Sequence, residues 1–219
     1  MAEAGHRAAT RAGYDAIAEQ YAELFHAKLE AAPLDRALLS AFAEMVRRDH
    51  PDAHVLEVGS GPGAVTAHLH QLGLRVAGID LSPAMVGIAR RAHPRLRFDV
   101  GDMAALDRAD GSLSGLVAWY SLIHVPAAER QQVVDEFRRV LRPGGYALIA
   151  FQVGDDTLHL DEAFGHAISL DFHRLQPDAV AESLHRAGFE LTAQVVRAPE
   201  AGSAASKVPQ AVLIARRPS

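Results

Sequence analysis

The amino-acid sequence predicts a single α/β domain of doubly wound topology: a mainly parallel seven-stranded sheet, an antiparallel C-terminal hairpin and an N-terminal helical cap. Three observations lead to this prediction. A helical stretch opens the chain, short β-branched or aliphatic runs then alternate with helical segments over residues 53–151, and two more β runs close it. The 219 residues suffice for one full domain of this class with a modest appendage, so we expect one core across residues 1–219.

The predicted helical cap covers residues 1–50. Apolar positions recur at helical spacing from Thr10 to about Glu30, and a second such stretch runs from Leu34 to Arg48. The segment His50-Pro51-Asp52 then interrupts the periodicity, which indicates the end of the cap.

The alternating core covers residues 53–151. Its predicted strands are His54–Val58, Leu74–Ile79, Arg95–Val100, Leu113–Trp119 and Tyr146–Phe151. Its predicted helices are Ala64–Leu72, Pro83–Ala92 and Ala127–Leu141. Ser82 is expected to cap the second helix, with Pro83 in its first turn. Doubly wound sheets bind ligands at the carboxyl ends of their strands, so we look for functional residues there.

The segment 152–174 breaks the alternation and carries His159, His166 and His173 among acidic and small residues. An insertion at this position, above the strand ends, is interpreted as a lid or substrate wall.

Residues 175–219 are expected to complete the sheet. A helix at Pro177–Arg186 leads through Gly188 into strands at Phe189–Val196 and Val208–Arg216, joined by the short segment Ala201–Ser206. Because a short connection joins antiparallel strands, these two should form a hairpin at the sheet edge.

Composition narrows the classes of function. The formal net charge is −5 and the arginine pairs are scattered, so the chain lacks the basic stripe of a nucleic-acid-binding protein. The absence of cysteine removes disulfides, thiolate zinc sites and thiol catalysis. No apolar run approaches the roughly 18 residues of a membrane span, and the first residues do not have the pattern of a signal peptide. We therefore expect a cytoplasmic protein without a membrane partner.

The strongest local signal is a buried strand, Val55–Val58, that ends in the glycine-rich turn Gly59-Ser60-Gly61-Pro62-Gly63 and opens a helix. Glycines allow unusual backbone angles and leave no Cβ to obstruct a ligand above the turn. The same run satisfies the dinucleotide pattern G-x-G-x-x-G/A through Gly59, Gly61 and Ala64. The turn alone therefore does not distinguish a site for a dinucleotide from a site for another cofactor that contains adenosine.

Two acidic residues follow the next strands. Asp80, after Gly78-Ile79, is placed to accept hydrogen bonds from both hydroxyls of an adenosine ribose. Asp102, in Val100-Gly101-Asp102-Met103, is placed to accept from an adenine amino group while Met103 flanks the ring. Asp102 at the end of the third strand is thus the feature that distinguishes the other adenosine cofactor from a dinucleotide.

In this order the motifs resemble those of class I S-adenosylmethionine (SAM)-dependent methyltransferases, which have a Rossmann-like fold. The resemblance runs from Val55 to Phe151 and includes Leu81-Ser82-Pro83-Ala84-Met85 and Leu141-Arg142-Pro143-Gly144-Gly145-Tyr146, the latter typical of small-molecule methyltransferases. Outside this core, Tyr14-Asp15-x-x-Ala18-x-x-Tyr21 resembles the capping helix of the same group. Leu184-x-x-Ala187-Gly188-Phe189 resembles its late helix-to-strand passage.

The resemblance implies SAM as cofactor and a small molecule as methyl acceptor. The glycines would pass beneath the methionyl part and ribose, with Glu57 behind them, and Asp80 would hold the ribose. Leu81 and Met85 would pack on the adenosine, and Trp119 and Tyr120 would face the sulfonium or the acceptor. The residues expected to bind the cofactor are Tyr14, Tyr21, Glu57, Gly59, Gly61, Gly63, Asp80, Leu81, Met85, Asp102, Met103, Trp119 and Tyr120.

His124, after the fourth strand, is the candidate catalytic base, because an ordinary imidazole pKa suits removal of an acceptor proton. The alternative is a positional role near the cofactor, since displacement at a sulfonium needs alignment more than proton transfer. No residue is assigned to a metal, although His159, Asp161 and His166 are weighed as ligands; their spacing matches no tight metal motif.

Two other functions remain open. An NAD-dependent oxidoreductase is compatible with the turn and Asp80, but the chain has only two lysines, Lys28 and Lys207, and no evident Tyr-x-x-x-Lys pair. A non-catalytic SAM-binding protein is the other alternative. The acceptor, the atom methylated and the oligomeric state are also open, with a homodimer among the states allowed.

Overall fold

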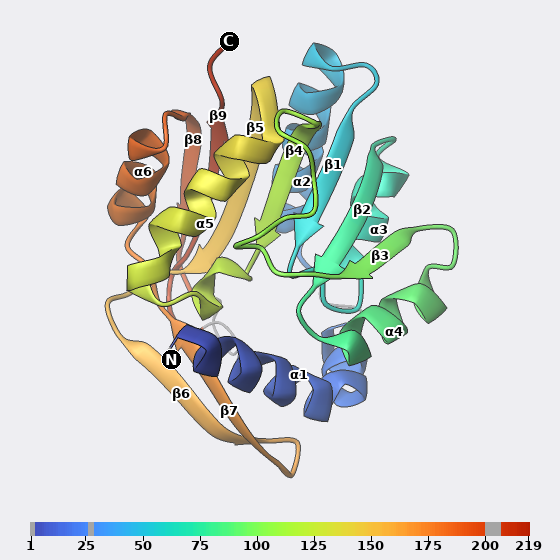
Figure 1. Ribbon diagram of the computed structural model, residues 1–219, viewed down its shortest axis with the longest axis vertical. Coiled ribbons are helices and arrows are strands. Elements are labelled where there is room, and N and C mark those ends of the chain that lie inside the picture. Colours follow the sequence, from blue (N-terminus) through green and yellow to red (C-terminus); the bar gives the residue numbers. More distant parts are fainter. Residues whose placement is uncertain (1–2, 26–28, 200–206) are drawn as a thin grey trace.

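The computed structural model describes residues 3–25, 29–199 and 207–219, and its centre is the predicted seven-stranded sheet (Figure 1). The strand order is β3-β2-β1-β4-β5-β9-β8. Strands β1 to β5 run parallel, and β9 lies antiparallel between β5 and β8, which confirms the doubly wound topology with an antiparallel C-terminal hairpin. The strands are β1 (His54–Val58), β2 (Arg75–Asp80), β3 (Arg97–Val100), β4 (Leu113–Trp119), β5 (Leu141–Gln152), β8 (Glu190–Arg197) and β9 (Gln210–Arg216).

Helices cover both faces of the sheet, as its two-sided burial requires. α5 (Ala127–Val140) and α6 (Pro177–Arg186) lie on one face, where Phe137, Leu184 and Phe189 are fully buried. α2 (Pro33–Asp49) and α3 (Ala64–Gln71) lie on the other, where Phe42 and Leu69 are buried. The central strands are therefore apolar on both sides and end at a single functional edge.

Helix α4 (Pro83–Ala92) begins as the sequence predicts. The Ser82 hydroxyl accepts a hydrogen bond from the Met85 amide at 3.1 Å, and Pro83 occupies the first turn, where its missing N–H costs nothing. Buried Val86 and Ala89 pack against Phe98 of β3, which fixes the helix beside the carboxyl ends of β2 and β3.

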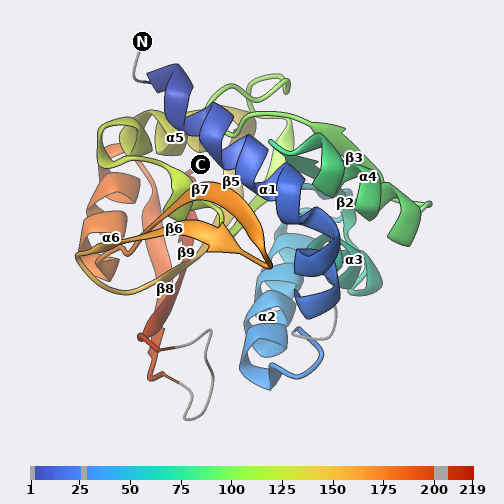
Figure 2. The same cartoon turned by 90° about the horizontal axis from the view of Figure 1, so that it is seen from below.

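Two elements cross the carboxyl ends of the parallel strands. They are helix α1 (Glu3–Phe25) and the antiparallel hairpin of β6 (Thr157–Ala163) and β7 (His166–His173), which lie side by side below the arrowheads (Figures 1 and 2). Gly13 of α1 faces Leu170 of β7 so closely that an added methyl group would lie 2.8 Å from the leucine side chain. The carboxyl edge of the sheet is thus covered by α1 and the hairpin.

The structure refines several boundaries. α1 begins at Glu3, earlier than the expected Thr10, while residues 26–28 of that predicted helix and the 201–206 connection lie outside the described residues. β5 begins at Leu141 because that residue already pairs with Leu113 of β4. The 152–174 insertion, interpreted from the sequence as a lid or substrate wall, contains the two-stranded β6–β7 sheet. Within the described ranges, no helix is long and apolar enough to cross a membrane.

Candidate functional site

The glycine turn after β1 forms the floor of a cavity at the carboxyl edge. Gly59 has φ +68°, and a Cβ there would overlap the Ser121 Cβ, so only glycine fits against the turn that follows β4. The Ser121 hydroxyl donates to the Val58 carbonyl at 2.7 Å and holds the two turns together. At Gly61, with φ +51°, a Cβ would meet no atom within 4 Å, so its absence leaves open space above the turn.

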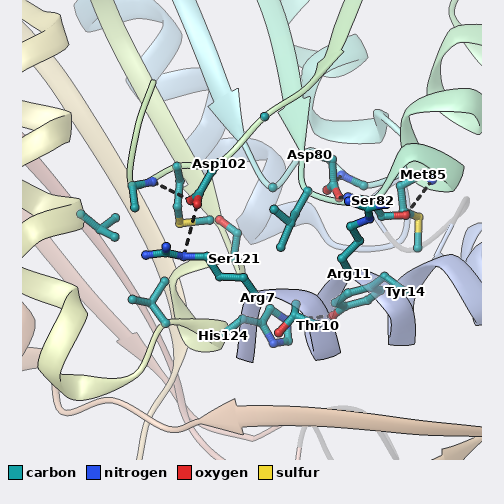
Figure 3. Close-up of a pocket in the computed structure, with 18 of the residues that line it drawn as sticks. Arg7, Thr10, Arg11, Tyr14, Asp80, Ser82, Met85, Asp102, Ser121 and His124 are labelled. Atoms are coloured by element: carbon teal, nitrogen blue, oxygen red, sulfur yellow. Dashed lines mark hydrogen bonds and ion pairs between the residues drawn. The ribbon is translucent and has the colours of Figure 1, made fainter. Parts of the chain in front are cut away.

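Asp80, at the end of β2, is positioned by backbone donors on both sides. Its Oδ2 accepts from the Gly61 amide at 2.7 Å, and its Oδ1 accepts from the Ser82 amide at 2.9 Å. Burial raises the pKa of this carboxyl, while the two amide hydrogen bonds act in the opposite direction. The carboxylate is thereby fixed between the glycine turn and the start of α4 (Figure 3).

Asp102 lies beyond the end of β3, on the other side of the same cavity. Its Oδ1 accepts from the Ala104 amide at 2.8 Å, and its Oδ2 lies 3.2 Å from the Nε of Arg7 in α1 (Figure 3). The Arg7 guanidinium also pairs with Glu129 at the start of α5, and His6 Nδ1 lies 3.4 Å from the same carboxylate. The start of α1 is thus tied to β3 and α5.

Most of the predicted site residues line this one cavity. Its lining includes Tyr14, Tyr21, Gly59, Gly61, Asp80, Leu81, Met85, Asp102, Met103, Trp119, Tyr120 and His124. Two predicted residues lie elsewhere: Gly63 begins α3 and packs against Phe98, and Glu57 is buried beneath the turn. The fold therefore brings together residues from five stretches of the chain, 14–21, 59–61, 80–85, 102–103 and 119–124.

Glu57 accepts a hydrogen bond from the Thr66 hydroxyl of α3. Burial raises the pKa of its carboxyl to about 8 despite that hydrogen bond. Glu57 thus ties β1 to α3 with its carboxyl mostly protonated at neutral pH.

A second, larger cavity of about 430 Å³ adjoins the first across Trp119 and Tyr120, which line both. Its roof is the apolar inner face of the hairpin: Leu158, Leu160, Phe164, Ile168, Leu170 and Phe172. The polar side chains that line this cavity include Asp35, Arg197 and Gln210. The arrangement offers two connected compartments, one lined by acidic residues and glycines, the other mainly apolar.

His124 joins three elements at the boundary of the first cavity. Its Nδ1 lies 2.8 Å from the Asp171 carbonyl of β7, and its Nε2 lies 2.8 Å from the Tyr14 hydroxyl of α1. Since a carbonyl only accepts, Nδ1 carries the hydrogen and Nε2 accepts from Tyr14. Burial lowers the pKa of His124 to about 4 and raises that of Tyr14, so both groups are neutral near pH 7.

Asp15 is a site-forming residue that the sequence prediction missed. Its Oδ1 accepts from the Ser82 hydroxyl at 2.5 Å and from the Ala84 amide at 3.1 Å, so α1 docks onto the first turn of α4. The Tyr14-Asp15 pair was visible as a motif, but its partner 67 residues away was not. The contacts of Arg7 and Glu129 likewise join remote segments and leave no local signal.

The histidines of the insertion contact different partners. His159 pairs with Asp171 at 2.7 Å, His166 lies 3.3 Å from Gln20, and His173 lies 2.8 Å from Thr157. In the part of the chain that the structure describes, no three His, Asp or Glu side chains are placed to share a metal ion.

Comparison with known proteins agrees with this geometry. A family model described as a methyltransferase domain matches residues 55–145. A demethylmenaquinone methyltransferase of Chlorobaculum parvum is 31% identical over 147 residues, which are 65% of this chain and 59% of that protein. The DhpI structure in complex with SAH superposes with a TM-score of 0.73 at 21% identity, covering 98% of each chain. A Burkholderia thailandensis 1,6-didemethyltoxoflavin-N1-methyltransferase gives a TM-score of 0.62 at 20% identity, with 92% of this chain and 91% of that one covered.

The structure is a doubly wound sheet with a cavity at its strand ends that is lined by the glycine turn, Asp80 and Asp102. Residues 55–145 match the methyltransferase domain family, and the motif order and fold of the chain are those of the class I SAM-dependent methyltransferase superfamily. The chain spans less than two thirds of the length of the first curated relatives it matches, 59% in the C. parvum protein.

Proposed function

We propose that this protein transfers the methyl group of SAM to a small-molecule acceptor. The observation that carries the proposal is the pairing of two cavities: Asp80 and Asp102 line the first together with the glycine turn, and Trp119 and Tyr120 separate it from an apolar second cavity. A cofactor in the first would present its reactive group toward the second.

The residues of the first cavity fit SAM. The open space above Gly61 is where a Cβ would intrude on a ligand, and the Asp80 carboxylate beside it suits the two ribose hydroxyls. Asp102, across the cavity, suits the adenine amino group. Its Oδ2 becomes available to accept that hydrogen bond once the ion pair with Arg7 opens. SAM would supply a methyl group bound to a sulfonium sulfur. The leaving group in the transfer is a neutral thioether, which needs no protonation.

The chain's own contribution is alignment and exclusion of water. Tyr14 and Tyr21 of α1 lie over the first cavity, and the hairpin closes the second. We infer a positioning role for His124, because its low pKa and the engagement of both ring nitrogens leave it poorly suited to take a proton.

The alternatives are less well supported. An NAD site would need room for a pyrophosphate at the glycine turn, whereas Asp80 accepts there from the Gly61 amide. A non-catalytic SAM-binding protein would have no use for the second cavity.

A mass-spectrometric screen with isotope-labelled SAM tests the proposal. We expect one or more small molecules from a metabolite mixture to gain the labelled methyl group with the wild type, and to gain much less with Asp80→Ala when the SAM concentration is near the wild-type dissociation constant. The relatives' names supply the first compounds to add, demethylmenaquinone and 1,6-didemethyltoxoflavin. Tight SAM binding without any labelled product across broad metabolite classes would favour the non-catalytic alternative.

Three further proposals accompany this function. The chain acts as one domain in which residues 1–50 cap the cofactor, 53–151 bind it, 152–174 cover the acceptor and 175–219 complete the sheet. It works in the cytoplasm without nucleic-acid partners, which cell fractionation and a nucleic-acid binding assay test. A homodimer is the oligomer to look for, by light scattering at several concentrations.

A further inference from the structure

The β6–β7 hairpin has one apolar face and one polar face, because successive side chains of a strand point to opposite sides. The apolar face lines the second cavity with Leu158, Leu160, Ile168, Leu170 and Phe172, and Phe164 lines it from the tip. The alternate residues are exposed and include His159, Ala167, Ser169 and Asp171. The hairpin crosses below the strand ends of the main sheet, so its apolar face forms the outer wall of that cavity (Figure 1).

Part of the apolar face packs against the chain itself. Leu170 is 1% exposed and lies against Gly13 of α1. Phe172 contacts the His124 ring in a tilted, edge-on arrangement, with 4.8 Å between the ring centroids. These two side chains fix the hairpin to α1 and to the turn after β4, and their burial is explained by the fold alone.

The rest of the apolar face is less well covered. Leu158 is 43% exposed, and Leu160 and Ile168 are only partly buried, although all three line the cavity. Apolar side chains gathered at a cavity wall and left uncovered are typical of a surface that contacts a ligand. Leu158, Leu160 and Ile168 are therefore available to an acceptor in a way that Leu170 is not.

The wall that the second cavity shares with the first is aromatic. Three of the chain's four tyrosines and its single tryptophan line both cavities: Tyr14, Tyr21, Trp119 and Tyr120. The rings of Trp119 and Tyr120 are perpendicular, with 5.6 Å between centroids, and those of Tyr14 and Tyr21 likewise at 5.5 Å. Tyr and Trp side chains have few torsions and contact an aromatic partner through ring faces and edges, so this wall favours a planar ring.

The two walls lie at different distances from the cofactor compartment. The aromatic wall belongs to both cavities, whereas none of the described hairpin residues lines the first. The volume of the second cavity, about 430 Å³, falls within the roughly 300 to 1,000 Å³ of pockets that bury small organic molecules. A ring compound in it would contact aromatic side chains on the cofactor side and aliphatic side chains on the hairpin side.

We infer that the second cavity binds an aromatic, mainly apolar methyl acceptor, and that Leu158, Leu160 and Ile168 select it. The inference rests on the proposed function, since it names the chemical class of the acceptor for the same site. The selection acts on the part of the acceptor that lies against the hairpin, where a polar substituent would lose its water without gaining a hydrogen bond. Acceptors that are polar over their whole surface, such as sugars and amino acids, are disfavoured.

Three bicyclic alcohols test the inference: 2-naphthol, trans-decahydro-2-naphthol and 7-hydroxyquinazoline-2,4-dione. They share one hydroxyl group and differ in their rings, which are aromatic, saturated, or aromatic with two amide groups in one ring. Trp119 is the chain's single tryptophan, so its indole N–H gives one cross-peak in a ¹⁵N-labelled sample. With the first cavity filled by the demethylated cofactor product, a shift of that cross-peak reports binding in the second.

We expect 2-naphthol to bind at least about 10-fold more tightly than the dione, because the amide groups of the dione would be desolvated against the hairpin. It should also bind at least about 3-fold more tightly than the saturated alcohol, which cannot make aromatic contacts with Trp119 and the tyrosines.

A double variant, Leu160→Thr with Ile168→Thr, makes the hairpin wall polar while keeping residues that suit strands. It should weaken the binding of 2-naphthol by at least about 5-fold and leave the binding of the dione unchanged. The matched control, Ala167→Thr with Ser169→Thr, places two threonines on the exposed face of β7 and should keep the wild-type preference. Circular dichroism and the affinity for SAM establish that each variant is folded.

Four outcomes overturn the inference: equal binding of the three probes, tighter binding of the dione or of the saturated alcohol, an unchanged preference in the folded Leu160/Ile168 variant, or binding of SAM without any response to the probes. The comparison of probes in the wild type needs no variant and decides the matter if the double variant does not fold. Failure of the wild type to bind SAM would instead count against the proposed function, and calorimetry with SAM separates these two failures.

Discussion

At the residue scale, Asp80 is held by the Gly61 and Ser82 amides before any ligand arrives, so under the proposed function its carboxylate is preorganised for ribose hydroxyls. Asp102 is in a different state, because Arg7 occupies one of its oxygens. The two carboxylates at the strand ends therefore differ. Asp80 is a fixed hydrogen-bond acceptor, whereas Asp102 would have to release Arg7 before it accepts from a ligand.

Replacing Asp80 by Ala should weaken SAM binding by about 2 to 3 kcal/mol, because two ribose hydroxyls lose a charged acceptor in a largely desolvated site. Calorimetry measures the change, and the exposed Asp52→Ala serves as control. A folded Asp80→Ala protein with wild-type affinity would place the ribose elsewhere.

Replacing His124 by Ala should lower the affinity for SAM, since the contacts of His124 hold α1 and β7 against the site. Tyr14→Phe, which removes the donor to Nε2, should produce part of the same loss. Affinity, methyl-transfer rate and its pH dependence are measured on each variant. A His124→Ala protein with unchanged affinity, a rate lower by about 10² or more and a missing limb in the pH profile would make His124 the base.

Glu57 should make stability depend on pH. Its pKa is raised from an ordinary 4.5 to about 8 in the folded state, so the unfolded chain ionises first and the free energy of unfolding falls as pH rises between those values. Glu57→Gln lacks this loss. Relative to the wild type, the variant should therefore gain roughly 3 kcal/mol between pH 5 and pH 8 in urea unfolding. An equal difference at both pH values would show that Glu57 ionises normally.

At the scale of elements, the site depends on how α1 and the β6–β7 hairpin lie across the strand ends (Figure 2). α1 is attached at one point by Asp15 on α4, at another by Arg7 on Asp102 and Glu129, and through Tyr14 to His124. α1 also packs on α4 through a small apolar cluster of Ala18 with Met85 and Ile88, which is much smaller than the clusters that cover the sheet. We therefore expect α1 to open more readily than the sheet.

SAM should protect the amides of α1, from Thr10 to Phe25, against hydrogen exchange, because a bound cofactor completes the contacts of Tyr14 and Tyr21. Asp15→Ala should speed exchange in the same range without ligand, since it removes the attachment to Ser82 and Ala84. Exchange in α1 that ignores SAM would remove its role as a lid, and the amides of β4 serve as internal reference.

The alternation of strands and helices was predictable because each period is local. The hairpin also had a local signal: Leu158 and Leu160, then Ile168, Leu170 and Phe172, alternate with polar residues around Phe164-Gly165, but the segment was interpreted only as a lid or substrate wall. The pairs that Arg7 and Asp15 form had no such signal, since each joins segments far apart in the sequence. Only the folded chain shows these contacts.

At the scale of the whole molecule, one carboxyl edge of the sheet carries two compartments, and helices on both faces leave that edge as the place for a ligand (Figure 1). The strand order and the C-terminal hairpin place Gln210 and Arg197 beside the turn after β4, so the sheet's far edge contributes to the second compartment. Under the proposed function, the cofactor and acceptor ends of the site therefore come from different halves of the sheet.

The choice of cofactor is the central claim, and calorimetry tests it most directly. The account predicts that the purified protein binds SAM and its demethylated product in the micromolar range and NAD at least about 10-fold more weakly, because Asp80 and Asp102 form an adenosine site without a pyrophosphate cradle. Tighter binding of NAD than of SAM would contradict it.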